Sequence, residues 1–181
     1  GAQSEYNELQ RLFQYPFIES IHAITDDIGH SHISENSPES ASQRASDFMY
    51  EYKGMTIKQE HKSTSSQTIT LKGSRSRVHH KPGKKNKANG EIAYVRYGEF
   101  HVLSVYFKGK SSGAFYVPAH RLPRHPEYRN RYPMSISEKI LAPIMSTNLE
   151  EVLEDVYMNH DRECNKTIPN EPQSNTLMKF F

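Results

Sequence analysis

The segment from Asp47 to Lys62 constrains the fold more than any other part of the chain. Polar residues alternate with apolar ones on both sides of Lys53-Gly54, and the apolar positions are Phe48, Tyr50, Tyr52, Met55 and Ile57. Two runs of period two joined by a two-residue turn predict a β-hairpin with one buried face. The chain therefore has to build a sheet and cover it with other elements.

Further strands are expected downstream. Residues 100–107, FHVLSVYF, are almost continuously apolar, which predicts a strand buried on both faces after a turn at Gly98-Glu99. Residues 63–71 are expected to continue a strand, and residues 114–117 to form one that Pro118 ends.

Helical spacing marks both ends of the chain. The spacing from Ser4 to Thr25 predicts two short helices, or one helix kinked at Pro16. A further short helix is expected from Ser37 to Ala45. Residues 135–145 are weakly helical and broken by Pro143, whereas Leu149 to Asn159 has an apolar stripe and an expected capping box of Thr147 and Glu150. We expect an α/β (α+β) fold, a central mixed β-sheet flanked by helices.

Composition narrows the function classes. The 181 residues carry 23 basic and 21 acidic side chains, a net charge of +2, and no run approaches eighteen apolar residues. With no signal-like pattern either, we expect a soluble, cytoplasmic protein without a membrane span. Cys164 is the single cysteine and the histidine pairs lack spaced partners, so we do not expect a zinc site.

Three charged residues of the hairpin are expected to meet. If Lys53-Gly54 forms the turn, Asp47 lies opposite Glu60, with Cβ atoms about 5 Å apart, and Lys62 points to the same face about 7 Å along the strand. Adjacent carboxylates repel unless a proton, a partner or a hard cation such as Mg²⁺ intervenes. Asp47, Glu60 and the backbone carbonyl of His61 are the expected metal ligands, and Lys62 is placed to orient or deprotonate a water.

The pattern resembles a known family. Asp47, twelve intervening residues and then Glu60-His61-Lys62 are similar to the motif of the PD-(D/E)XK nuclease superfamily, and the size and helical N-terminal region resemble an orthodox type II restriction endonuclease of the PvuII kind. The resemblance covers residues 40–110, although Ser46 stands where many members have proline. It implies that Asp47, Glu60 and Lys62 are catalytic, and that Mg²⁺ is the cofactor with Mn²⁺ able to substitute.

The resemblance also implies an organisation. A single restriction-endonuclease-like nuclease domain is expected over residues 3–165, with its catalytic core at about 38–118 and a C-terminal tail at 166–181. Some family members add a glutamate from a preceding helix, for which Glu39 is a candidate, and Glu51 is a second acid left open. By itself, Glu-x-Lys is also typical of a solvated strand; the opposed Asp47 and the apolar strand 100–107 favour the functional interpretation.

A basic segment lies between the hairpin and that strand. Residues 72–90 contain seven Lys or Arg and no acid, which is typical of a phosphate-binding surface and also of a solvated loop. The expected DNA-binding residues are Ser63, Ser65, Lys72, Arg75, Arg77, His79, His80, Lys81, Lys84 and Lys85. The arginines of residues 119–133 are expected either to contact phosphates or to pair with acids.

Together these features predict a Mg²⁺-dependent, type II site-specific endodeoxyribonuclease that hydrolyses double-stranded DNA without a small-molecule substrate. A two-fold homodimer suits a palindromic site, with the N-terminal helices and the last helix as expected contacts. Two alternatives stay open: a structure-specific nuclease of the junction resolvase type, and a non-catalytic DNA-binding module that uses the basic loop.

Overall fold

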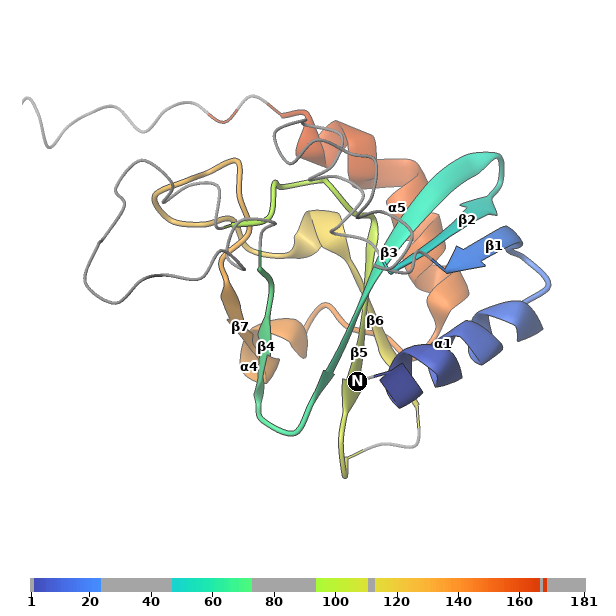
Figure 1. Ribbon diagram of the computed structural model, residues 1–181. Helices are drawn as coiled ribbons and strands as arrows, with labels where there is room; N and C mark the ends of the chain where they lie inside the picture. Colours follow the sequence, from blue (N-terminus) through green and yellow to red (C-terminus); the bar gives the residue numbers. More distant parts are fainter. Residues whose placement is uncertain (1, 24–46, 73–93, 111–112, 167, 169–181) are drawn as a thin grey trace, which may run out of the picture.

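The computed structural model describes residues 2–23, 47–72, 94–110, 113–166 and 168 (Figure 1). Glu39, the short helix expected over residues 37–45, the basic segment after Lys72 and most of the expected tail lie outside the described residues. Within them, the observed order is α1, β1 to β6, a short 3-10 helix η4, β7, α4 and α5.

A mixed five-stranded sheet forms the centre of the molecule, in the order β1-β2-β3-β5-β6. The strands are β1 (Glu19–Ala23), β2 (Phe48–Tyr52), β3 (Met55–Thr64), β5 (Val102–Phe107) and β6 (Phe115–Pro118). Neighbouring strands are antiparallel, apart from β3 and β5, which run parallel. Helices flank this sheet, so the expected α+β fold with a central mixed sheet is confirmed.

The hairpin has the predicted register. Tyr52 pairs with Met55 and Phe48 with Gln59, so that Lys53 and Gly54 alone form the turn. Both turn residues have positive φ, 49° at Lys53 and 77° at Gly54, as a two-residue turn that follows the strand twist requires. Glycine adopts this conformation without a steric penalty, whereas Lys53 does so at a cost that the paired strands outweigh.

The expectation for the first segment is wrong in its second half. Helix α1 spans Ala2–Gln14, but residues 19–23 form β1 rather than a second helix. Pro16 breaks the helix, and the chain then pairs with the exposed edge of β2, with Ala23 opposite Phe48. Edge pairing of this kind depends on the tertiary fold, which overrides the helical spacing of the apolar residues.

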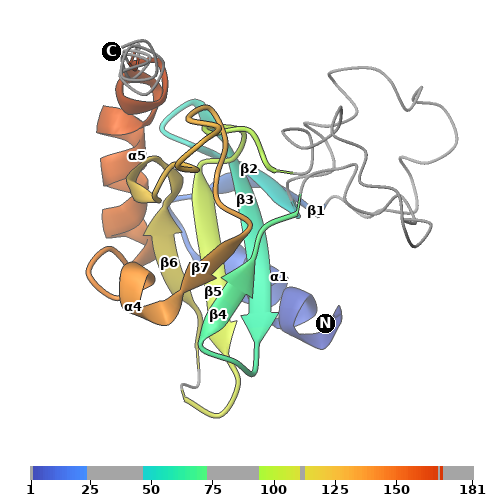
Figure 2. The ribbon, with the colours of Figure 1, turned by 90° about the vertical axis from the view of Figure 1, so that its left-hand side faces the viewer.

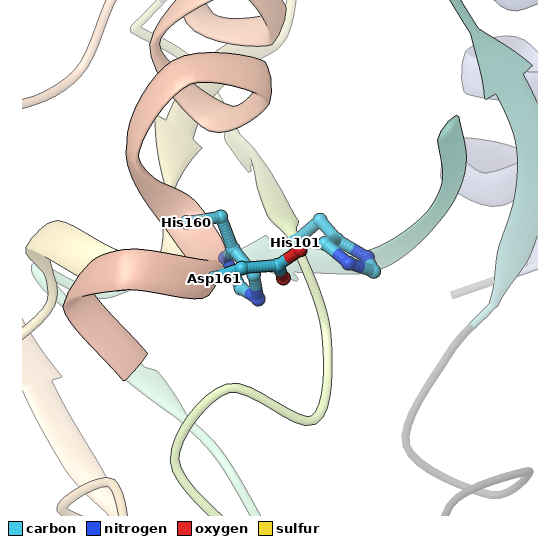
Figure 3. Close-up of side chains that lie close together, drawn as sticks. All are labelled: His101, His160 and Asp161. Carbon is cyan, nitrogen blue, oxygen red and sulfur yellow. The ribbon is translucent and has the colours of Figure 1, made fainter. Parts of the chain in front are cut away.

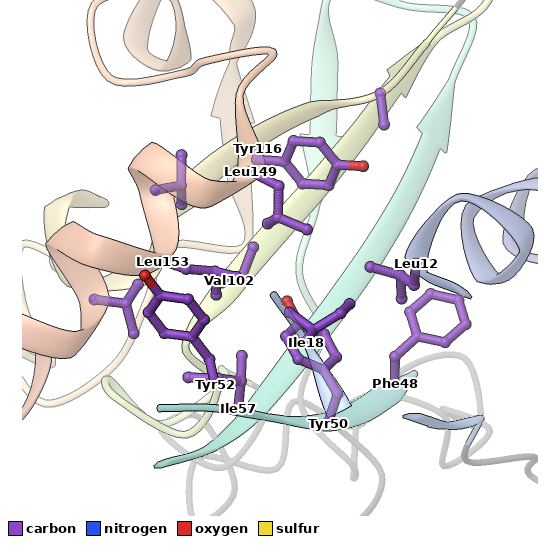
Figure 4. Packing of buried hydrophobic residues seen from close by; sticks show 13 residues of the cluster. Leu12, Ile18, Phe48, Tyr50, Tyr52, Ile57, Val102, Tyr116, Leu149 and Leu153 are labelled. Atoms are coloured by element: carbon purple, nitrogen blue, oxygen red, sulfur yellow. The ribbon is translucent and has the colours of Figure 1, made fainter. Parts of the chain in front are cut away.

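Two apolar clusters cover the two faces of the sheet. One joins α1 and α5 to Phe48, Tyr50, Ile57 and Val102 (Figure 4). The other gathers Leu103, Val105 and Phe107 of β5 with residues of a small second sheet, β4 (Thr68–Thr70) paired with β7 (Ser135–Ser137). Figure 2 shows this small sheet in front of β3 and β5, on the side away from α1. Strand β5 is thus buried on both faces, as predicted.

The last helix is longer than predicted and begins differently. Helix α5 spans Leu149–Cys164, and its N-cap is Asn148, whose side chain accepts a hydrogen bond from the backbone N–H of Glu151. The expected capping box of Thr147 and Glu150 is therefore wrong: the N-cap lies one residue later, and the Glu151 side chain accepts from the Ser146 hydroxyl. The weakly helical stretch before it divides into β7 and the short α4 (Glu138–Leu141). No helix in the described part of the chain is long and apolar enough to cross a membrane.

Candidate functional site

Strand β3 presents two chemically different faces. Lys58, Glu60 and Lys62 alternate with Gln59 and His61, and successive side chains of a strand point to opposite sides of a sheet. We call the first set the carboxylate face and the second the network face. The network face points toward α1 and the carboxylate face away from it, because Gln59 contacts Glu8 of α1 and Glu60 is paired with Leu103 of the opposite cluster.

The carboxylate face brings the three predicted residues together. Lys62 Nζ lies 2.5 Å from Glu60 Oε1, which confirms that the two side chains share one side of the strand. Asp47 directly precedes β2, and its backbone N–H donates to the carbonyl of Gln59 at 3.0 Å. The Asp47 carboxylate accepts a hydrogen bond from the backbone N–H of His61 at 2.8 Å. The hairpin register thus holds Asp47 next to the residues that follow Gln59.

The pKa of Glu60 is strongly shifted by its surroundings. Burial, followed by the negative charge of Asp47, raises the pKa of Glu60 to about 8, although Lys62 acts in the opposite direction. The residue is only 8% exposed. Its Oε2 atom is buried and has no hydrogen-bond partner. A buried acceptor without a partner is costly, so this oxygen marks a place where the fold tolerates a loss of stability.

Lys62 keeps its charge in this setting. Burial lowers its pKa, but the attraction of Glu60 and Asp47 outweighs burial, and the pKa of Lys62 is raised overall. Glu5 of α1 also contributes to the rise, so a helix carboxylate lies within electrostatic range of Lys62. At neutral pH Lys62 is therefore a cation that can neutralise an anionic group rather than a ready base.

Glu99 is a further acid that the sequence analysis did not single out. Its charge also raises the pKa of Glu60. Burial raises the pKa of Glu99 itself, and the nearby Arg96, Arg131 and Lys58 lower it in part. The parallel pairing of β3 with β5 brings Glu99 here, because the carbonyl of Lys58 accepts the N–H of His101 at 2.8 Å. No local sequence spacing indicates that Glu99 lies near Glu60. The one available indication is that Glu99 directly precedes the predicted buried strand.

On the network face, the side chains of Gln59 and His61 are fully hydrogen-bonded, whereas the buried hydroxyl of Ser63 has no partner. Tyr50 Oη donates to Gln59 Oε1 at 2.7 Å, and Gln59 Nε2 donates to Glu8 Oε1 and to Ser104 Oγ, both at 2.9 Å. The two ring nitrogens of His61 lie 2.7 Å from the hydroxyls of Ser104 and Ser4. Burial lowers the pKa of His61 to about 4, so its ring is neutral at physiological pH.

The remaining predicted residues are scattered. Ser63 lies on the network side of β3, Ser65 is exposed after the end of β3, and Lys72 is exposed after β4. Arg75, Arg77, His79, His80, Lys81, Lys84 and Lys85 lie outside the described residues. Glu51, paired with Thr56 and Glu19, lies near the turn end of the hairpin and away from Glu60.

The second arginine-rich stretch is largely structural. Arg121 pairs with Asp155, its Nε lying 2.5 Å from Oδ2. Arg124 donates to the carbonyls of Arg129 and Glu163 and stacks over the Tyr97 ring. Of the two alternatives for this stretch, pairing with an acid therefore holds for Arg121, whereas Arg124 binds backbone carbonyls instead.

A separate group of metal-ligating side chains was also missed. His101, His160 and Asp161 each offer a ligand atom, and these atoms lie within 4.8 Å of one another, so the group could hold a metal ion (Figure 3). However, His101 Nδ1 accepts a hydrogen bond from the backbone N–H of Lys58 at 3.0 Å. The proton of the neutral ring therefore sits on Nε2, and a metal at Nε2 would have to displace it. The ligand atoms of this group are therefore close enough to bind a metal ion, but the protonation state of His101 opposes binding.

The carboxylate face suits a hard divalent cation better. Asp47, Glu60 and the His61 backbone carbonyl supply oxygen ligands of the type that Mg²⁺ prefers, and the unpartnered Oε2 of Glu60 would gain a partner. A cation would also remove the repulsion that raises the pKa of Glu60. The residues present therefore fit such an ion, which the resemblance implies.

Comparison with known proteins adds no relative from which to transfer a function. No protein-family description, no curated protein and no solved structure matches the chain.

Proposed function

We propose that this protein is a Mg²⁺-dependent endodeoxyribonuclease that hydrolyses phosphodiester bonds in double-stranded DNA, site-specific in the manner of type II restriction endonucleases. The observation that carries the proposal is the state of Glu60: a buried carboxyl beside Asp47, bonded to Lys62 through one oxygen and unpartnered at the other. This arrangement does not stabilise the strand, because burying an uncharged residue at position 60 would cost less free energy than burying a carboxyl group.

Each residue has a distinct role in the proposed reaction. Asp47, Glu60 and the carbonyl of His61 would hold the ion, which when bound polarises a phosphate and lowers the pKa of water. The Lys62 cation orients the attacking water and offsets the charge that develops on the phosphate. Lys62 lies beside Glu60, so its ammonium group is positioned next to the residues that would hold the ion.

The charges around the site favour a polyanionic substrate. Lys58 shares the carboxylate face with Glu60 and Lys62, and Arg96 and Arg131 act electrostatically on Glu99, which in turn acts on Glu60. Positive groups around a cluster of acids attract a phosphate backbone toward it. A homodimer with two such sites, acting in the cytoplasm, would cut both strands of a duplex at a palindromic sequence.

The first test is cleavage of methylation-free plasmid or phage DNA with Mg²⁺, with Mn²⁺ and with EDTA. The wild-type protein is expected to give discrete fragments only with metal, and Asp47→Asn to give none while retaining DNA in a gel shift. Glu51→Gln is the matched control, since it removes an exposed acid from β2, the strand that begins directly after Asp47.

The other outcomes separate the alternatives. Cleavage of four-way junctions but not of linear duplex would indicate a structure-specific nuclease. Binding without cleavage under either cation would indicate a DNA-binding module and would contradict the proposal. Sedimentation of the protein with a palindromic duplex measures whether two copies bind.

A further inference from the structure

A small hydroxyl side chain interrupts the apolar strand β5. In β5, Ser104 is flanked by Leu103 and Val105, and all three residues are completely buried. A serine in a core strand costs stability unless its hydroxyl is hydrogen-bonded. The contacts of this hydroxyl therefore show what the strand gains by carrying it.

The Ser104 hydroxyl contacts three successive residues of β3. It accepts a hydrogen bond from Gln59 Nε2 at 2.9 Å, lies 2.7 Å from His61 Nδ1 and reaches the backbone carbonyl of Glu60 at 3.4 Å. Ser104 is also the residue that pairs with His61 in the parallel ladder. One side chain thus holds the segment that carries the proposed metal ligands.

The hydrogen-bonding capacity of a hydroxyl allows two arrangements. Ser104 either donates to His61 Nδ1, in which case His61 Nε2–H donates to Ser4, or accepts from Nδ1–H and donates to the Glu60 carbonyl. Both arrangements satisfy the His61 ring at each nitrogen, one toward α1 and one toward β5. The ring is thereby clamped between a helix and a strand.

The clamp acts on the carboxylate face through the backbone. The peptide N–H of His61 donates to Asp47 Oδ2 at 2.8 Å, so the orientation of this peptide sets the position of the Asp47 carboxylate. The carbonyl of the same residue is the third proposed ligand. We propose that Ser104 is a positioning residue that, through the ring of His61 and the carbonyl of Glu60, fixes Asp47, Glu60 and the His61 carbonyl in the geometry that binds a divalent cation.

This inference rests on the proposed metal site and is tested with Ser104→Ala, Ser104→Thr and Tyr50→Phe. Tyr50→Phe is the matched control, because it removes a buried hydroxyl that contacts Gln59 but neither Glu60 nor His61. The measurements are the Mg²⁺ concentration for half-maximal cleavage, kcat and KM for DNA, the denaturant midpoint, and Mn²⁺ binding followed by electron paramagnetic resonance.

Ser104→Ala is expected to raise the half-activating Mg²⁺ concentration and to weaken Mn²⁺ binding by about tenfold, with KM for DNA unchanged. Ser104→Thr, which keeps the hydroxyl, is expected to recover most of the metal affinity. Tyr50→Phe is expected to shift the denaturant midpoint as Ser104→Ala does, but to leave the metal dependence unaltered.

Equal metal dependence in Ser104→Ala and Tyr50→Phe, or no change in either, would overturn the inference and leave Ser104 a packing residue. Mn²⁺ binding by the wild-type protein without DNA cleavage would contradict the nuclease proposal alone, and the inference would then be decided by the Mn²⁺ affinities. Absence of both binding and cleavage in the wild-type protein would overturn both.

Discussion

The two faces of β3 use the same backbone for opposite purposes. On the network face, Gln59 and His61 are buried and all of their side-chain nitrogen and oxygen atoms have partners. On the carboxylate face, Glu60 is also buried, yet one of its oxygens has no partner and a second acid lies beside it. Satisfied groups define the position of a strand, whereas an unsatisfied group at a fixed position is available for chemistry.

The largest effect on stability is expected on the network face. Gln59→Leu leaves Tyr50 without its acceptor and removes a donor from the fully buried Glu8, whose pKa burial already raises. Loss of these bonds should lower the free energy of unfolding by about 3 kcal/mol or more. Urea unfolding measures it, and a loss below about 1 kcal/mol would show that the network is not rigidly required.

The adjacent residue is expected to respond in the opposite direction. Glu60→Gln removes a carboxyl whose pKa burial and Asp47 raise to about 8, so that its ionised form is disfavoured in the folded state, and in EDTA at pH 8 the substitution should raise the free energy of unfolding by about 1 kcal/mol. Cleavage in Mg²⁺ should fall by about a thousandfold. Denaturant unfolding and single-turnover cleavage of the same preparation test both; a destabilised but active variant would remove the contrast between the faces.

The two faces should also respond to pH with opposite sign. The pKa of Glu60 is raised from 4.5 to about 8, so its contribution to stability is present below pH 4.5 and is lost as pH rises to about 8. The pKa of His61 is lowered from 6.5 to about 4, so its contribution is present above pH 6.5 and is lost as pH falls through 4. Unfolding in EDTA from pH 4 to 9 measures both limbs.

Glu60→Gln should flatten the alkaline limb and leave the acid limb unchanged, whereas His61→Gln should do the reverse. Groups that do not interact with Glu60 or His61 titrate alike in the wild type and in each variant, so the differences between these curves report the two residues and the groups coupled to them. If the alkaline limb persists unchanged in Glu60→Gln, a group other than Glu60 releases the proton that causes it.

The smallest effect is expected at His101, His160 and Asp161. Their nitrogen and oxygen atoms are close enough for a metal, but the backbone N–H of Lys58 already occupies His101 Nδ1. Zn²⁺ at 100 μM bound to these residues should therefore stabilise the protein by less than about 1 kcal/mol, measured as the difference in Zn²⁺-dependent thermal unfolding between the wild type and His160→Gln. A larger stabilisation that disappears in His160→Gln would show that side chains with hydrogen-bond partners can still bind a metal. The contrast between the satisfied and unsatisfied faces of β3 would then not predict where a metal binds.

Local pattern predicted the hairpin, its turn and the approach of Asp47, Glu60 and Lys62, because register in a two-residue hairpin follows from counting. It did not predict β1 at residues 19–23, which forms by pairing with β2. Nor did it find Glu99 or the group of His101 and His160, since these meet others through the parallel pairing of β3 with β5 and the packing of α5. Contacts between distant segments leave no periodic trace in a sequence.

The turn at Lys53 and Gly54 has a consequence for how this protein can vary. Because side chains alternate along a strand, adding or removing one residue there would exchange the two faces of β3, turning Glu60 and Lys62 toward α1 and Gln59 and His61 toward the opposite cluster. Insertions of two residues would keep the faces but displace Asp47 along the strand. A two-residue turn, with Asp47 six residues before Lys53 and Glu60 six residues after Gly54, thus has its length fixed by the chemistry at the other end of the hairpin.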